Sequence, residues 1–230
     1  MADAVPCAPR SRVWIATPAV VGVAIAAACM SGYAELAEDL NISPSIYAFD
    51  TRVTAVVQSW RGPAITTFFR AITWGASSVP VTLVTVAAIA VLMWLNRYRD
   101  ALFVACVVAL GTGLGTIAKR VTERPRPPVA SALIELPTSY SFPSGHTLAA
   151  LLVWAVIIIA VWRLTVRPSI RWSVAAVGSA LVVLTALSRV YLGVHWPSDV
   201  VASWLLGAAW LALCTGGFLS WERAVGPAEC

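Results

Sequence analysis

Long apolar stretches separated by short polar segments dominate the pattern of this 230-residue chain. Six apolar segments can be marked, at 13–30, 79–95, 101–118, 147–162, 174–187 and 200–219. A helix needs about 20 apolar residues to span a bilayer, and polar flanks can extend the shorter segments to the interface. Because lipid offers the backbone no hydrogen-bond partners, helices are the expected spanning form. The pattern therefore predicts six transmembrane helices.

The longest connection between these segments covers residues 34–78. It is acidic at its start, over 35–39, and then carries two amphipathic stretches, DTRVTAVVQSW and PAITTFFRAITW. We expect both to form short interfacial helices, which either pack over the ends of the bundle or guide an acyl chain sideways into a site. The predicted fold class is an all-α integral membrane bundle of six transmembrane helices with interfacial helices in the 34–78 connection, as a single domain over 1–230.

The composition agrees with a membrane protein. Hydrophobic residues make up 59% of the chain and charged residues only 12%, whereas a soluble domain has a charged share of roughly 25%. The net charge of +5 comes from basic residues scattered between apolar segments, so no nucleic-acid partner is indicated. The five cysteines show no metal-ligand spacing, and we expect neither a metal nor a cofactor. The small residues of AIAAACM leave open that the first segment is a removable signal peptide.

The short connections rich in arginine indicate the orientation of the chain. With six spans both termini lie on one side, together with the connections at 96–100 and 163–173. Short basic loops are retained in the cytoplasm. The other side also carries eight basic residues, but four of them belong to the polar clusters described next. We therefore predict a multi-pass cell-membrane protein with cytoplasmic termini and these clusters on the extracytoplasmic side.

Three polar clusters interrupt the ends of the predicted spans. They are AKRVTERPRPP (118–128), FPSGH (142–146) and SRVYLGVHWPSD (188–199). In an alternating bundle the connections between spans three and four and between spans five and six emerge on one face, so topology alone brings the clusters together. Both histidines and the single lysine of the chain lie in them. Ionisable groups at membrane depth are costly and usually functional.

The basic and small residues of these clusters suit a multiply charged oxyanion. Lys119, Arg126 and Arg189 can surround it, since a guanidinium matches phosphate oxygens bidentately. Ser144 and Gly145 stand at the start of the fourth span, where backbone N–H groups and the helix dipole favour an anion. Gly145 allows the backbone a close approach, and Ser144 can cap the helix or donate to the anion. These residues predict a phosphate site.

The two histidines add catalytic chemistry to this site. One imidazole can attack phosphorus while the other protonates the leaving oxygen. Asp199 follows His195 by four residues and can accept from one imidazole nitrogen, which leaves the other as the nucleophile. His146 has no such partner in its own motif, and we assign it the acid role. Asp199 is the only carboxylate expected near the histidines, so the cations, and not a metal ion, are expected to stabilise the transition state.

At these residues the sequence resembles the type 2 phosphatidic acid phosphatase family, the membrane branch of a superfamily that includes vanadium haloperoxidases. The family pattern is Lys-x6-Arg-Pro, Pro-Ser-Gly-His and Ser-Arg-x5-His-x3-Asp, and all three parts match without a gap over 119–199. The resemblance implies a six-helix bundle that hydrolyses lipid phosphates or polyprenyl diphosphates without a metal. It implies that His195 forms a phosphohistidine, that Asp199 orients it and that His146 is the general acid. The phosphate cradle that it implies consists of Lys119, Arg126, Ser144, Gly145 and Arg189.

Other interpretations of the same residues stay open. An anionic-lipid transporter or binding protein would use the basic cluster without chemistry, and bound vanadate would permit peroxidase chemistry. Arg120 and Arg124 are additional cations that a second phosphate could use. Phosphatidate, phosphatidylglycerol phosphate and undecaprenyl diphosphate all offer the required phosphate head and apolar tail. Transfer to an acceptor other than water is compatible with the same intermediate.

Overall fold

A computed structural model describes residues 12–40 and 43–225 of the chain. Within these ranges the chain forms eight α-helices, one short 3₁₀ helix and no strand, as the predicted all-α class requires. The helices are α1 (Arg12–Asp39), α2 (Pro44–Gln58), α3 (Pro63–Gly75), α4 (Ser78–Trp94), α5 (Tyr98–Thr122), α6 (Gly145–Leu164), α7 (Pro168–Tyr191) and α8 (Pro197–Val225), and the 3₁₀ helix is η1 (Val129–Ser131).

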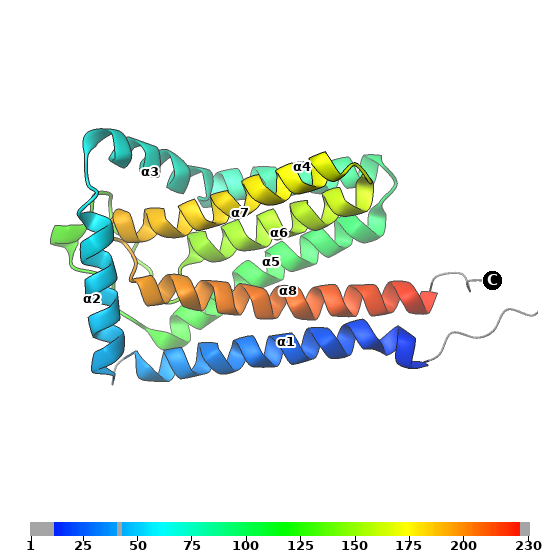
Figure 1. The fold of residues 1–230 in the computed structure, drawn as a ribbon, viewed down its shortest axis with the longest axis horizontal. Helices are drawn as coiled ribbons and strands as arrows, with labels where there is room; N and C mark the ends of the chain where they lie inside the picture. Colours follow the sequence, from blue (N-terminus) through cyan, green and yellow to red (C-terminus); the bar gives the residue numbers. More distant parts are fainter. Residues whose placement is uncertain (1–11, 41–42, 226–230) are drawn as a thin grey trace, which may run out of the picture.

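Five of the described helices are long and apolar enough to cross a membrane, namely α1, α5, α6, α7 and α8. Helices α3 and α4 pass the same test only as a pair, and the chain bends by 49° between them. If this bent pair counts as one span, the chain crosses six times in alternating directions, as the apolar pattern predicts (Figure 1).

Two features differ from the sequence-based expectation. Helix α1 runs to Asp39, so the acidic residues assigned to the start of the connection form the last turns of the first helix instead. No glycine or proline follows Gly32 in this stretch, and Ala, Glu and Leu are strong helix formers. The two amphipathic stretches do form α2 and α3, but α3 is followed after a short bend by α4, and the pair together has the length and composition of a broken span or a re-entrant loop.

The outer surface of the bundle is apolar. Large hydrophobic side chains such as Val79, Leu83, Trp94, Leu102 and Ile117 are exposed. A water-soluble monomer rarely exposes so much apolar surface, whereas the hydrocarbon core of a bilayer requires it. The surface and the spanning helices agree with a multi-pass membrane protein.

Helices α1 and α8 lie antiparallel along one side of the bundle (Figure 1). The backbone N–H of Ala19 donates to Ser220 Oγ over 3.0 Å, so the first and last described turns share one end of the molecule. The helices approach closely at glycines: a Cβ added at Gly216 would come within 2.5 Å of the carbonyl oxygen of Pro18. At the opposite end, α2 lies across the bundle and packs against α7 and α8 (Figure 1).

Candidate active site

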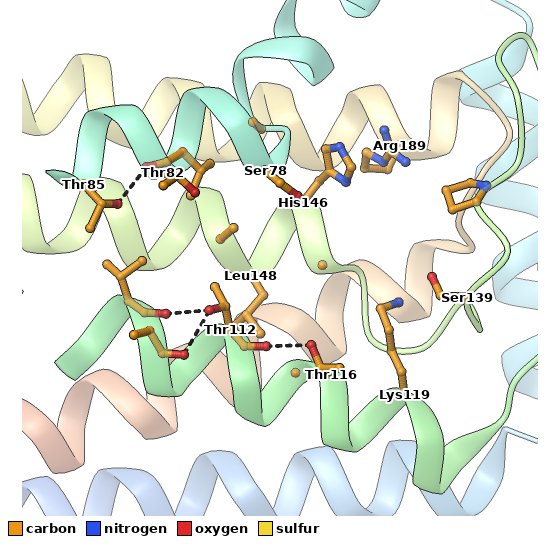
Figure 2. Close-up of a pocket in the computed structure, with 18 of the residues that line it drawn as sticks. Ser78, Thr82, Thr85, Thr112, Thr116, Lys119, Ser139, His146, Leu148 and Arg189 are labelled. Atoms are coloured by element: carbon orange, nitrogen blue, oxygen red, sulfur yellow. Dashed lines mark hydrogen bonds between the residues drawn. The ribbon is translucent and has the colours of Figure 1, made fainter. Parts of the chain in front are cut away.

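The three polar clusters meet at the end of the bundle opposite the first and last described turns. A cavity of about 490 Å³ lies there and extends between α4 and α5 (Figure 2). Six of the eight residues predicted from the motifs line it, namely Lys119, Arg126, Gly145, His146, Arg189 and His195. They come from the end of α5, the loop after it, the first turn of α6, the last turn of α7 and the turn before α8. Alternation of the spans therefore produces the convergence that the topology predicts.

His195 is fixed in one tautomer by its neighbours. Its Nδ1 lies 3.1 Å from Oδ2 of Asp199, and the same oxygen accepts from the backbone N–H of Trp196 over 2.9 Å. Its Nε2 lies 3.2 Å from Nη1 of Arg126, which can only donate. Both contacts assign the proton to Nδ1. Nε2 is thus unprotonated, and its lone pair is directed toward Arg126 and the cavity.

The surroundings of His195 keep its ring uncharged. The side chain is almost completely buried, and burial lowers the pKa of His195 from 6.5 to about 3, although the hydrogen bond and charge of Asp199 oppose the shift. The imidazole is therefore neutral at neutral pH. A neutral ring with an unprotonated Nε2 is the form that can act as a nucleophile.

Asp199 lies behind His195 and outside the cavity wall, where it is completely buried. Its second oxygen, Oδ1, accepts from Nη1 of Arg124 over 2.6 Å. Nη2 of Arg124 pairs in turn with Oδ2 of Asp50 over 2.6 Å. Asp50 of α2 is a second carboxylate near the histidine, which sequence reasoning missed. Arg124 is buried between two carboxylates, so the idea that it serves a second phosphate is not supported.

Lys119 and Arg126 are held in place by carbonyl oxygens. Nζ of Lys119 donates to the carbonyl groups of Tyr140 and Ser141, over 2.8 and 3.3 Å. Nε of Arg126 donates to the carbonyl group of Ser139 over 2.8 Å. A carbonyl dipole orients a cation without neutralising its charge, so both groups keep a positive charge that attracts an anion in the cavity.

Arg189 is the most deeply buried of the three cations, with 1% of its surface exposed. Its Nη1 donates to the hydroxyl of Thr73 on α3, and its Nε has no hydrogen-bond partner among residues 12–40 and 43–225. In the part of the chain that the structure describes, none of Lys119, Arg126 and Arg189 forms an ion pair with a carboxylate. Unpaired buried charge is costly unless a ligand compensates it, which favours an anionic ligand here.

The start of α6 carries the two small residues of the predicted phosphate site. Ser144 is the N-cap residue, but its hydroxyl makes no capping bond and accepts from Thr147 Oγ1 over 3.0 Å. It is completely buried and does not line the cavity. Gly145 does line it, and an added Cβ would lie 3.8 Å from Cε of Lys119, an ordinary contact. The protein itself could therefore accommodate a side chain at position 145, and the glycine instead leaves this part of the cavity free for a ligand.

Away from the charged end the cavity is a groove between α4 and α5 (Figure 2). Its walls are mostly aliphatic and carry the threonines 82, 85, 112 and 116. The hydroxyls of Thr85, Thr112 and Thr116 donate to carbonyl groups of their own helices, over 2.7, 2.8 and 3.1 Å, so they are already satisfied as donors. The cavity has a cationic end and a largely apolar length, which matches an amphiphile with an anionic head.

The chain resembles known membrane phosphatases in sequence. A family model described as the PAP2 superfamily matches residues 100–221. An undecaprenyl-diphosphatase from Sulfolobus acidocaldarius is 38% identical over 141 residues, which cover 58% of this chain and 59% of that protein, less than two thirds of its length. A phosphatidylglycerophosphatase B from Bacillus subtilis is 33% identical over 143 residues, which cover 62% of this chain and 69% of that protein.

Solved structures share the fold. The crystal structure of the first transmembrane PAP2 type phosphatidylglycerolphosphate phosphatase from Bacillus subtilis matches 89% of this chain and 98% of its own, with a TM-score of 0.73. That of Aquifex aeolicus LpxE matches 72% of this chain and 94% of its own, with a TM-score of 0.57. Both are 23% identical to this chain, so they support the helical architecture alone.

Proposed function

This chain belongs to the PAP2 superfamily, and from that premise we propose that it hydrolyses a lipid phosphate or polyprenyl diphosphate through a phosphohistidine intermediate, without a metal ion. The observation that carries the proposal is the state of His195, a buried neutral ring oriented by Asp199. Its reactive nitrogen adjoins a cavity whose wall includes the cations Lys119, Arg126 and Arg189. A site that only binds anions needs the cations but has no use for an oriented nucleophile.

The first chemical step transfers the phosphoryl group to His195. The phosphate oxygens bind the three cations, and the contact between Arg126 and Nε2 gives way to the phosphate. Nε2 attacks phosphorus, and the bond between phosphorus and the leaving oxygen breaks. His146, on the same cavity wall, enters this step as the imidazolium, donates one proton to that oxygen and is left as the neutral imidazole. The cations stabilise the charge that spreads over the equatorial oxygens.

The second step returns His195 to its starting state. Water attacks the phosphohistidine, His146 takes the proton of the water, and the bond between Nε2 and phosphorus breaks. Asp199 keeps its hydrogen bond to Nδ1 throughout and stabilises the positive charge that the phosphorylated ring carries. The products are inorganic phosphate and a lipid alcohol, or a polyprenyl phosphate when the substrate is a diphosphate.

The groove between α4 and α5 supports a lipid as the substrate. We expect the phosphate at the end near Lys119 and His146 and the hydrocarbon tail along the groove toward Thr85 (Figure 2). The names of the two similar proteins refer to a polyprenyl diphosphate and to a glycerophospholipid phosphate. Each of these lipids has a phosphate head for the cationic end of the cavity and an apolar tail for the groove.

Basic residues support an extracytoplasmic active site and cytoplasmic termini. The end of the bundle where α1 begins and α8 ends carries arginines in short connections and at the end of α8, namely Arg97, Arg99, Arg163, Arg167, Arg171 and Arg223. At the other end, six of the eight basic residues have contacts within the protein, namely Arg61, Arg70, Lys119, Arg124, Arg126 and Arg189. Arg163, Arg171 and Arg223 also have partners within the protein, so the proposed orientation rests on the short arginine-rich connections, which are usually retained in the cytoplasm. A fluorescent-protein fusion after residue 230 is expected to fluoresce, and a dark fusion at normal expression would contradict the orientation.

The test of the function is phosphate release from a lipid panel in EDTA. The purified protein is expected to release phosphate from one or more of phosphatidate, phosphatidylglycerol phosphate and undecaprenyl diphosphate, and His195→Ala is expected to release none. Glu38→Gln, an exposed substitution on α1, serves as the control and is expected to keep the activity. Lipid binding without phosphate release by the parent protein would favour the anionic-lipid transporter instead.

A further inference from the structure

A buried chain of polar contacts connects the interfacial helix α2 to the proposed nucleophile. Oδ2 of Asp50 accepts from Nη2 of Arg124 and from the hydroxyl of Ser198, both over 2.6 Å. Nη1 of Arg124 donates to Oδ1 of Asp199 over 2.6 Å, and Oδ2 of Asp199 faces Nδ1 of His195 over 3.1 Å. Every member of this series is buried, with at most 8% of its surface exposed.

The connectivity determines how Asp199 can be oriented. Because Arg124 engages Oδ1, the other oxygen of the carboxylate is the one that meets the imidazole. A guanidinium has a rigid planar fork, so its orientation is fixed when both of its ends are bonded. Asp50 bonds the second end and also accepts from the backbone N–H of Ser198 over 2.8 Å. The position of α2 over the bundle end is therefore tied to the rotation of Asp199.

We propose that Arg124, anchored by Asp50 of α2, is a positioning residue that holds Asp199 in the rotation that keeps the proton of His195 on Nδ1. Neither residue lines the cavity, so both act through Asp199 and neither contacts the substrate.

Arg124→Gln removes the positive charge and the hydrogen bond that holds Oδ1 of Asp199, so the carboxylate of Asp199 can rotate toward other donors. Asp50→Asn keeps the size of the side chain but loosens the far end of the guanidinium. Its effect is expected to be the smaller of the two.

The proposal rests on the proposed function for its kinetic readout but not for its spectroscopic one. In phosphatidate hydrolysis, kcat is expected to fall on the order of 100-fold for Arg124→Gln and about 10-fold for Asp50→Asn, the range typical of lost orienting partners. KM is expected to stay within about twofold, because the phosphate-binding cations are untouched. Arg124→Lys restores the charge but not the fork, and is expected to recover only part of the rate. Glu38→Gln is the matched control.

The deciding measurement is the tautomer of His195. The chain has two histidines, so protein labelled with ¹⁵N-histidine and purified without a histidine tag gives two imidazole signal sets. The wild type is expected to show His195 protonated on Nδ1. In Arg124→Gln the contact of Arg126 with Nε2 remains, so the Nδ1–H form is expected to lose part of its population to the other tautomer, and the spectrum shows a mixture. If Arg124→Gln does not fold, Ser198→Ala, which deletes one hydroxyl of the series, takes its place.

Three results would overturn the inference. The first is a wild-type protein in which His195 is protonated on Nε2. The second is an Arg124→Gln or Ser198→Ala protein that loses activity but keeps His195 protonated on Nδ1. The third is an Asp50→Asn protein with the kcat of the wild type. Loss of activity with an unchanged tautomer would make the role of the series purely structural. If the wild type hydrolyses no lipid phosphate, the proposed function fails, whereas the tautomer comparison still decides the role of Arg124.

Discussion

Replacing Asp199 by asparagine removes one charge at the centre of the proposed mechanism without changing the size of the side chain. Each carboxylate oxygen faces a donor: Oδ1 faces Arg124 over 2.6 Å, and Oδ2 faces the N–H of Trp196 over 2.9 Å as well as His195. An amide has a single oxygen, so one of these donors must face an NH₂ group.

The energies of these contacts decide the orientation of the amide. A hydrogen bond to a charged group contributes about 1.5–3 kcal/mol and a neutral one about 0.5–1.5 kcal/mol, so the oxygen is expected to stay with Arg124. The NH₂ group then donates to Nδ1 of His195 and moves the ring proton to Nε2, which breaks the contact of Nε2 with Nη1 of Arg126. The midpoints of these ranges differ by about 1.3 kcal/mol, which leaves roughly a tenth of the molecules with the amide oxygen toward His195 and hence with the ring in the reactive tautomer. Loss of the carboxylate charge beside the phosphorylated ring removes about another 1.5–3 kcal/mol, for a total of about 10²- to 10³-fold in kcat.

The assay is phosphate release from phosphatidate in detergent micelles, with purified wild type, Asp199→Asn and the exposed control Asp39→Asn. KM is expected to change little, because Lys119, Arg126 and Arg189 remain in place. Wild-type rates are expected for Asp39→Asn. An Asp199→Asn protein that folds and retains more than a tenth of the wild-type kcat would refute the argument that Asp199 selects the tautomer.

Three further perturbations test other parts of the structure. Since burial lowers the pKa of His195 to about 3, its neutral form persists from pH 7 to pH 5, and the single-turnover phosphorylation rate measured by quenched flow is expected not to fall. An imidazole with the ordinary pKa of 6.5 would be about 97% protonated at pH 5. A fall in the rate with a midpoint near pH 6.5 would therefore contradict the lowered pKa of His195. Arg189→Lys keeps the charge but loses the fork, and its kcat/KM is expected to drop about 10- to 100-fold, while Arg52→Lys on the exposed face of α2 stays at the wild-type value. Gly216→Val forces a side chain against the carbonyl of Pro18 and is expected to cost about 1–3 kcal/mol, seen as a lower Tm. The control Gly217→Val, with nothing within 4 Å of its added Cβ, leaves Tm unchanged, and equal Tm values would refute the close α1–α8 contact.

The spanning helices and the motif residues could be predicted because their signals are local or follow from topology. Apolar length identified the spans, and alternation placed the ends of α5 and α7 beside the starts of α6 and α8. The end of α1 was placed too early, because the acidic residues before Asp39 resemble a polar loop although they are good helix formers. The bend between α3 and α4 was missed, because two short helices and one broken span have the same apolar pattern.

Asp50 and Thr73 could not be identified from the sequence. Each is one of several polar residues on an amphipathic helix, where an exposed position is the usual one. Only the packing of α2 over the bundle end brings Asp50 to Arg124, and only the bend after α3 places Thr73 beside Arg189. Arg124 was interpreted as a ligand of a second phosphate for the same reason, since its two carboxylate partners are 74 and 75 residues away.

The most direct test of the central claim is a rapid-quench experiment with phosphatidate labelled with ³²P. The mechanism predicts that, within the first turnover, an acid-labile and base-stable label appears in the peptide that contains His195. It also predicts that His195→Ala acquires no label and releases no phosphate. Steady hydrolysis by the wild type with no label on His195 at any quench time, or hydrolysis by His195→Ala, would contradict the phosphohistidine mechanism.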